Sequence, residues 1–247
     1  MAFEMNHNRL FFQKTTNFYR NESLKEMAFK LVVKELVKHF KQGQEKKCVL
    51  AGISLECEQG KTYALAGVSG SGKSTLMHLC AGLDVPTSGQ VLLNNKPLYD
   101  YCMQERARLV VLVPQKPLLI KELTVLENVM LSGQILGMSH EEAKLEACFY
   151  LRAVGLEETY SWKVGALSGG QQQRVAIARA LVVKPAFLCA DEPTGSLDEQ
   201  TGKQIVELLL RCQKENGMGL IISSHNPLVI EQMEVVFVLK DGVLVPR

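Results

Sequence analysis

Short apolar runs and stretches of helical spacing alternate along most of this chain of 247 residues. Each apolar run is short enough to be a strand buried on both faces. The runs occupy residues 63–66, 109–113, 186–190 and 220–223. Helical spacing lies between them, at residues 74–82, 171–183 and 201–214. This alternation predicts an α/β fold with a mostly parallel sheet flanked by helices.

Further strand patterns stand towards the two ends of the chain. Strands are predicted at 30–39 and 49–57, and another at 91–93 follows a turn. We expect these strands to form an N-terminal antiparallel β part. Near the C-terminus, the runs 235–239 and 243–245 flank an Asp-Gly dipeptide, which favours a tight turn with positive φ and predicts a hairpin.

Residues 122–156 have the spacing of two helices separated by Gly137. We therefore expect a helical subdomain over about 116–180. Residues 1–26 show no sustained periodicity, so the folded domain is expected over 27–247. The N-terminal extension is interpreted as a disordered tail, as a segment that binds a partner or a membrane surface, or as the result of an upstream start codon.

The composition narrows the classes of function. Lys and Arg number 28 against 26 Asp and Glu, and a net charge of +2 gives no large positive field, so direct nucleic-acid binding is not expected. The seven cysteines include no C-x-x-C pair, and their odd number argues against a disulfide framework and favours a reducing cytoplasm. No apolar stretch approaches the roughly 20 residues that cross a bilayer. Transport across a membrane would need another chain.

A glycine-rich loop between the run 63–66 and the next helical stretch predicts a phosphate site. Glycines let the backbone turn tightly and point successive N–H groups at phosphate oxygens, with the positive end of a helix behind them. Lys73 is expected to reach the β- and γ-phosphates of ATP, and Ser74 to bind Mg²⁺. The spacing distinguishes this loop from an ordinary Gly/Ser-rich turn. The loop reads Gly67, Val68, Ser69, Gly70, Ser71, Gly72, Lys73, Ser74 and Thr75.

Two carboxylates, Asp191 and Glu192, follow the apolar run 186–190 directly. Ligands gather at the C-terminal edge of a parallel sheet, where this run would end. Asp191 is expected to hold Mg²⁺ directly or through water, and Glu192 to accept a proton from the water that attacks the γ-phosphate. The alternative is a solvated pair of loop carboxylates.

A second helix start with anion-binding character lies at residues 167–171. Ser168 stands where a helix N-cap is expected, and two glycines after it expose backbone N–H groups. One phosphate chain hardly needs two such cradles from one subunit. Helix capping alone is the simpler alternative. The residues concerned are Leu167, Ser168, Gly169, Gly170 and Gln171.

This segment, with Arg174 and Arg179 behind it, resembles the signature of ABC transporter ATPases. The resemblance covers roughly 28–245 and implies a P-loop NTPase of the ABC type. It also implies a head-to-tail dimer, either with a second copy or with a related ABC ATPase, in which each signature contacts the ATP on the partner's P-loop. A non-hydrolysing scaffold that uses ATP only to hold a dimer is the alternative that the presence of both Glu192 and His225 argues against.

The resemblance assigns roles to four further positions. Phe40 matches an aromatic residue that stacks on adenine, although a core role is also open. Gln115 matches a glutamine that contacts Mg²⁺ and the attacking water, and it begins the segment that touches the membrane partner. Asp198 matches an acidic residue that crosses the dimer interface, and its simpler role is helix capping. His225 matches the histidine that senses the γ-phosphate.

Within the family, the chain is similar to the LolD group of lipoprotein-releasing ATPases, which shares much with MacB-type efflux and FtsE-type division ATPases. The runs 83–84, 86–89, 123–129 and 190–198 carry this similarity. Val164, the pair 171–172 and the segment 160–163 depart from the group's pattern. The resemblance implies integral membrane permease subunits and a peripheral place on the cytoplasmic face of the bacterial inner membrane. A soluble ABC ATPase that acts on nucleic acid or ribosomes is a competing hypothesis.

Overall fold

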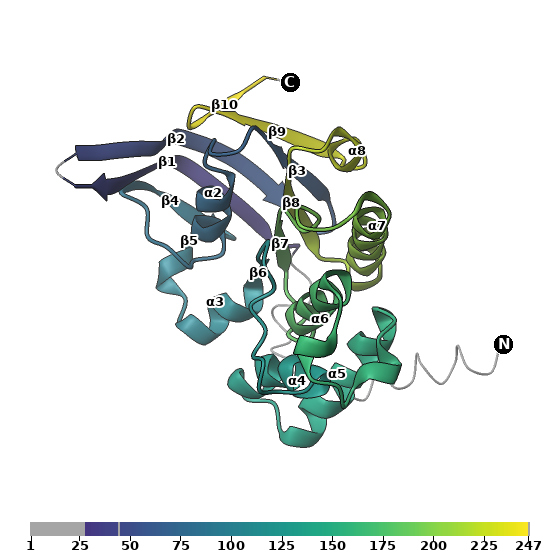
Figure 1. Ribbon diagram of the computed structural model, residues 1–247. Coiled ribbons are helices and arrows are strands. Elements are labelled where there is room, and N and C mark those ends of the chain that lie inside the picture. Colours follow the sequence, from purple (N-terminus) through teal and green to yellow (C-terminus); the bar gives the residue numbers. More distant parts are fainter. Residues whose placement is uncertain (1–27, 44, 247) are drawn as a thin grey trace.

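The computed structural model describes residues 28–43 and 45–246, so the predictions for the first 26 residues lie outside the described residues. One of its two sheets has six strands in the order β10-β9-β3-β8-β7-β6 (Figure 1). Four of its five strand pairings are parallel, and the hairpin of β9 and β10 at one edge is antiparallel, which confirms the mostly parallel sheet. The strands are β3 (Thr62–Ala66), β6 (Val110–Val113), β7 (Phe187–Asp191), β8 (Gly219–Ser224), β9 (Val235–Lys240) and β10 (Val243–Val245).

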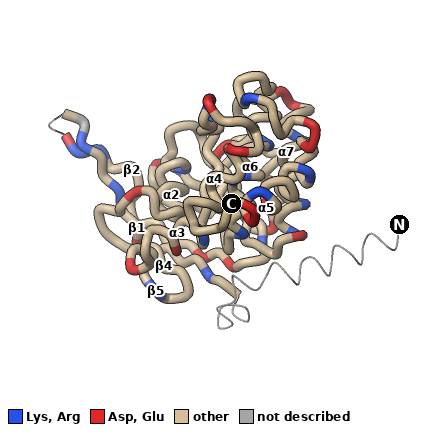
Figure 2. Tube along the Cα trace, turned by 90° about the horizontal axis from the view of Figure 1, so that it is seen from below, with Lys and Arg blue, Asp and Glu red and all other residues tan. Residues whose placement is uncertain are grey.

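The second sheet is antiparallel, in the order β2-β1-β4-β5, and confirms the N-terminal β part. Its hairpin is longer than predicted and projects from the body (Figures 1 and 2). A bulge at Glu35, with φ 47°, interrupts the pairing of β1. Gly89 lies against this bulge, where a Cβ would come within 2.2 Å of the Glu35 carbonyl oxygen, so no side chain fits. The strands are β1 (Lys30–Gln42), β2 (Glu45–Glu58), β4 (Ser88–Leu93) and β5 (Lys96–Pro97).

Helices surround the six-stranded sheet. α4, α5 and α6 gather at one end of the molecule, and α7 and α8 lie along another side (Figure 1). No helix within 28–43 and 45–246 is both long and apolar enough to cross a membrane. The α-helices are α2 (Lys73–Cys80), α3 (Met103–Leu109), α4 (Val125–Ile135), α5 (His140–Ala153), α6 (Gly169–Leu181), α7 (Glu199–Asn216) and α8 (Pro227–Ile230). Short 3-10 turns are η3 (Leu98–Asp100), η4 (Glu157–Thr159) and η5 (Val164–Ala166).

Helix α3 was not predicted, and the assignment of Leu109 to a strand was wrong, because Leu109 is the last residue of this helix. None of the residues of α3 is buried, so the helix lacks the apolar stripe that reveals a helix in sequence. Its start is fixed instead by Glu105, whose carboxylate accepts a hydrogen bond from the Cys102 backbone N–H at 2.9 Å.

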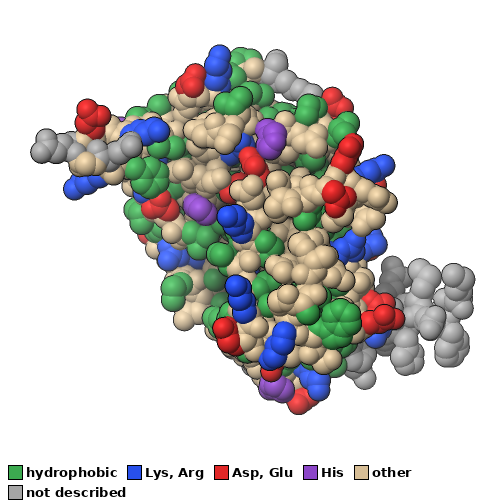
Figure 3. Space-filling view, viewed as in Figure 1, with side chains coloured by type: hydrophobic (Ala, Val, Ile, Leu, Met, Phe, Trp, Pro, Cys, Tyr) green, Lys and Arg blue, Asp and Glu red, His purple; other side chains and the backbone are tan. Residues whose placement is uncertain are grey.

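The core divides into two apolar clusters, one on each face of the parallel sheet. Leu188 and Ala190 of β7 belong to one cluster, and Phe187 and Cys189 belong to the other, because successive strand side chains point to opposite faces. Lys and Arg are interspersed with Asp and Glu along the chain (Figure 2). Apolar, charged and polar side chains are likewise mixed on the face shown in Figure 3.

Candidate nucleotide site

The loop after β3 can only be built with glycine at two of its turns. A Cβ at Gly67 would lie 2.4 Å from the carbonyl oxygen of Leu239, and one at Gly72 would lie 2.9 Å from Leu50 Cδ2. Gly72 has φ 106° and forms the N-cap of α2. The backbone is therefore drawn close to β9 and β2, and the loop delivers the chain into the first turn of α2.

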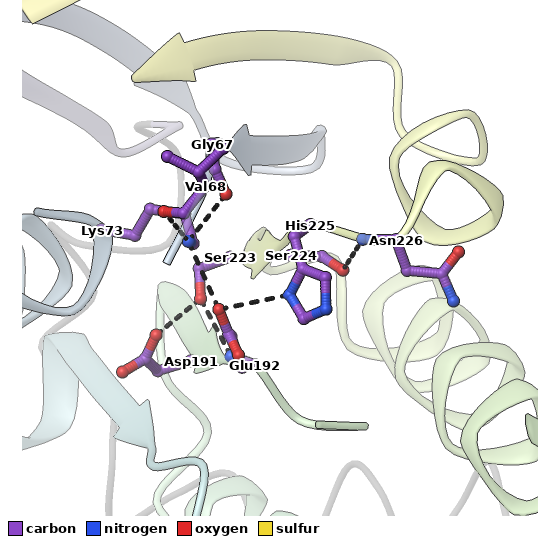
Figure 4. A network of polar contacts seen from close by, with 9 residues as sticks. All are labelled: Gly67, Val68, Lys73, Asp191, Glu192, Ser223, Ser224, His225 and Asn226. Atoms are coloured by element: carbon purple, nitrogen blue, oxygen red, sulfur yellow. Dashed lines mark hydrogen bonds and ion pairs between the residues drawn. The ribbon is translucent and has the colours of Figure 1, made fainter. Parts of the chain in front are cut away.

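Lys73 provides the positive charge of this loop, and three contacts hold its ammonium group. Its ammonium group donates to the carbonyl oxygens of Gly67 at 2.9 Å and Val68 at 3.0 Å, and it lies 3.3 Å from Glu192 Oε1 (Figure 4). The residue is only 4% exposed, so the positive charge is fixed beneath the loop. The hydroxyl of Ser71 is buried, and among the described residues it has no hydrogen-bond partner. Both groups suit a bound anion.

A cavity of about 280 Å³ opens over the loop. Six of the nine predicted loop residues line it: Ser69, Gly70, Gly72, Lys73, Ser74 and Thr75. Gln115, at the exit of β6, and Glu192 complete the wall together with Val49 of β2. The fold thus brings the phosphate loop, the glutamine and the second carboxylate to one place at the C-terminal edge of the sheet.

The two carboxylates at the end of β7, Asp191 and Glu192, have different surroundings. Asp191 is 6% exposed and accepts a hydrogen bond from the Ser223 hydroxyl at 2.5 Å. Glu192 faces the cavity, and its Oε1 lies 3.5 Å from His225 Nδ1 as well as near Lys73. The His225 side chain is 63% exposed, at the end of β8. Lysine, glutamate and histidine therefore converge, as Figure 4 shows.

Gln115 and Glu192 approach each other over Gly195. A Cβ on Gly195 would lie 2.8 Å from Gln115 Nε2 and 3.4 Å from Glu192 Oε2. The missing side chain leaves space for both. In β7, burial raises the pKa of the Cys189 thiol well above its usual range. This thiol is therefore neutral and puts no further negative charge beside Asp191.

The signature segment lies outside this cavity. Ser168 caps α6, where its hydroxyl accepts from the Gln171 backbone N–H at 3.3 Å and its own N–H donates to the Gln171 side chain at 2.9 Å. Gly170 packs against α7, since a Cβ there would lie 2.5 Å from Thr201 Cγ2. Gly169 and Gly170 form the first turn of α6, two residues earlier than the predicted helix start.

Two more predicted site residues stand apart from the cavity wall. Asp198 caps α7 by accepting from the Thr201 N–H at 2.9 Å, and hydrogen bonds from Thr201 lower the pKa of its carboxyl group. Phe40 lies on the projecting hairpin, 43% exposed, with the Lys38 ammonium 4.9 Å from its ring centroid. Neither residue lines the cavity that the P-loop forms.

Sequence reasoning missed three residues of the site: Val49, Gly195 and Ser223. Val49 looks like any strand residue. Gly195 stands in a Thr-Gly-Ser run after the carboxylates, which marks a turn but no contact with Gln115. Ser223 was assigned to the buried strand, and a serine at the end of an apolar run was the available signal for a hydrogen-bonding role.

Known proteins with similar sequences cover most of this chain. The family model described as ABC transporter matches residues 50–195. The lipoprotein-releasing system ATP-binding protein LolD of Rickettsia prowazekii (strain Madrid E) is 40% identical over 214 residues, covering 87% of this chain and 96% of the relative. LolD of Idiomarina loihiensis is 42% identical over 215 residues, covering 85% of this chain and 94% of that protein.

A solved structure agrees in fold as well as sequence. The dimeric post-hydrolysis state of the ATP-binding cassette MJ0796, bound to ADP and Pi, matches with a TM-score of 0.80 and 36% identity, covering 87% of this chain and 97% of that chain. A second dimeric structure of MJ0796 matches equally, with a TM-score of 0.80. The P-loop, Gln115, the signature and both carboxylates all lie inside the span matched by the family model. The chain therefore belongs to the ABC transporter family, as one of its ATP-hydrolysing subunits.

Proposed function

We propose that this chain is the ATP-hydrolysing subunit of a membrane ABC transporter that releases lipoproteins from the inner membrane. The convergence of Lys73 and His225 on Glu192 at the P-loop cavity carries the catalytic half of the proposal. Over most of its length the chain is similar to proteins named as lipoprotein-releasing, and this similarity supports lipoproteins as the cargo. MacB-like efflux and FtsE-like activity are the alternatives within the family.

The cavity residues have the chemistry for hydrolysis of a nucleoside triphosphate. The loop N–H groups, Lys73 and the Ser71 hydroxyl, which has no hydrogen-bond partner in the described part of the chain, would bind the phosphates. Glu192 accepts a proton from the attacking water, and His225 contacts the γ-phosphate. Phe40 would stack on adenine, which requires the projecting hairpin to reach over the nucleotide.

The oxygen atoms of Ser74, Gln115 and Asp191 suit Mg²⁺, which prefers hydroxyl, amide, carboxylate and water oxygens. Ser74 and Gln115 line the cavity. Asp191 is the last residue of β7 and directly precedes Glu192 in the sequence. When bound, Mg²⁺ supplies positive charge that balances the phosphate charge in the transition state. The chain's part is to hold these three oxygen donors in fixed positions.

A dimer would account for the signature's position. Ser168, Gly169, Gly170 and Gln171 form a capped helix start outside the cavity of their own chain. We propose that they bind the ATP held by a second copy or a related ABC ATPase, with Asp198 at the interface. The dimeric neighbours support this arrangement. Residues 27–247 would act as one nucleotide-binding domain whose helical subdomain, about 116–180, moves with the signature.

Transport requires integral membrane permease subunits, and the chain would bind them peripherally at the cytoplasmic face of the bacterial inner membrane. Affinity purification of the full chain from native membranes tests this. We expect a polytopic membrane protein to co-purify and ATP to drive release of a lipoprotein from reconstituted proteoliposomes. An ATPase that purifies without a membrane partner, or that binds nucleic acid with strong salt dependence, would contradict the proposal.

A further inference from the structure

Ser223, the fifth residue of β8, connects the Asp191 carboxylate to the Glu192 backbone through one hydroxyl group. The hydroxyl donates to Asp191 Oδ1 at 2.5 Å and accepts from the Glu192 backbone N–H at 2.9 Å (Figure 4). The donor distance is in the range of charge-assisted O–H···O⁻ bonds, which are stronger than neutral ones. The residue is fully buried, at 0% exposure, so water does not compete for either bond.

The backbone at Glu192 needs this support. Glu192 has φ 41°, a left-handed conformation that is costly for a residue with a side chain. Three hydrogen bonds hold the turn. Its N–H donates to the Ser223 carbonyl at 3.2 Å as well as to the hydroxyl, and its carbonyl accepts from the Gly195 N–H at 3.0 Å. This conformation directs the Glu192 side chain into the cavity, towards Lys73.

We propose that Ser223 is a positioning residue for ATP hydrolysis. Its hydroxyl fixes Asp191 Oδ1, so that Oδ2 would be the oxygen that binds Mg²⁺. The same hydroxyl also holds the backbone N–H of Glu192. The two carboxylates are thereby held at one relative orientation. Ser223 does not line the cavity and acts through its neighbours. The inference rests on the proposed hydrolytic function and adds a residue to it.

The neighbouring Ser224 does not have this role. Its hydroxyl accepts from the Asn226 backbone N–H at 3.0 Å and orders the turn that contains His225. Strand alternation sends the two serine side chains to opposite faces of the sheet, so only Ser223 faces the carboxylates. The two adjacent serines therefore have different roles.

The Ser223→Ala variant of the full chain tests the proposal. We expect kcat to fall about tenfold, the loss typical of a hydrogen bond to a charged group, with KM for ATP within about twofold of wild type. Without turnover, thermal stabilisation by a non-hydrolysable ATP analogue should need about tenfold more Mg²⁺. Ser223→Thr retains the hydroxyl and should restore both values. Ser223→Cys has a side chain of similar size that is only a weak donor, so it should behave like Ser223→Ala. If Ser223→Ala does not fold, Ser223→Cys is used in its place.

Thr62→Val is the matched control. Thr62 is also a buried hydroxyl of this sheet and bonds with Glu234 at 3.1 and 3.3 Å, at the opposite strand end from the site. Its kcat and Mg²⁺ dependence should equal those of wild type. A Ser223→Ala or Ser223→Cys protein with wild-type kcat and Mg²⁺ dependence overturns the inference while leaving ATP hydrolysis intact. An inactive wild-type protein, in contrast, would refute the proposed function.

Discussion

The ammonium nitrogen of Lys73 lies 3.3 Å from Oε1 of Glu192, joining the start of α2 to the end of β7. Both side chains are largely buried, at 4% and 19% exposure, so the attraction is screened little by water. A phosphate in the loop offers Lys73 a stronger and more highly charged partner. We infer that nucleotide binding draws the lysine from Glu192 and leaves this carboxylate available as a base.

Replacing Lys73 by alanine should weaken ATP binding at least tenfold. The substitution removes the one cation that the described residues place beneath the phosphate loop, and charge-assisted bonds to phosphate are among the strong ones. Equilibrium titration with a fluorescent ATP analogue measures the change. Lys61→Ala is the control, because Lys61 forms an exposed ion pair with Glu58, of the kind that contributes little. Unchanged affinity in the Lys73 variant would contradict the site.

Glu192→Gln should reduce kcat at least a hundredfold and trap an ATP-bound dimer. Glutamine has nearly the same shape but cannot accept the proton from water, and general-base catalysis contributes roughly 10²–10⁴-fold. Turnover assays and light scattering with ATP measure the two effects. Glu207→Gln, on the exposed side of α7, serves as the control. Undiminished hydrolysis, or a protein that stays monomeric with saturating ATP and its permease, would refute the assigned role.

Gly195→Ala should lower kcat about tenfold without changing the thermal midpoint. The added Cβ would come within 2.8 Å of Gln115 Nε2, the mobile end of a side chain, so the glutamine moves and the fold does not. Small displacements of positioning groups are costly in rate. Gly165→Ala is the matched control, because its Cβ would meet nothing within 4 Å. Wild-type kcat in Gly195→Ala would mean that Gln115 does not act from its observed position.

The cap of α7 should make stability depend on pH in acid. Hydrogen bonds from Thr201 lower the pKa of Asp198 below its ordinary value of 3.8. A carboxyl whose pKa is lower in the folded state contributes stability above 3.8, and this contribution is lost as pH falls through the lowered value. Asp198→Asn keeps a good N-cap without charge. The thermal midpoint of wild type should exceed that of the variant at pH 7, and the difference should disappear as the pH falls below 3.8 and through the lowered pKa. A constant difference would contradict this cause.

Local patterns were sufficient for the main elements of the fold. The parallel strands and their helices follow from apolar runs and helical spacing, and their observed bounds differ from the predicted ones by a few residues. The strand, loop and helix at the P-loop were equally predictable, because consecutive residues form all three. Helix α3 escaped prediction because its stability comes from a cap rather than from an apolar stripe.

By itself, the sequence determined the family, the position of the P-loop and the pair of carboxylates. The motifs that identify them are contiguous runs of residues, so each can be recognised locally. Only the tertiary structure decided that Ser223, and not Ser224, bonds to Asp191, and that Gly195 makes room for Gln115. These contacts join residues about 30 or more positions apart on different strands and loops. Their geometry depends on strand register and on which face each side chain occupies, which no single run of residues contains.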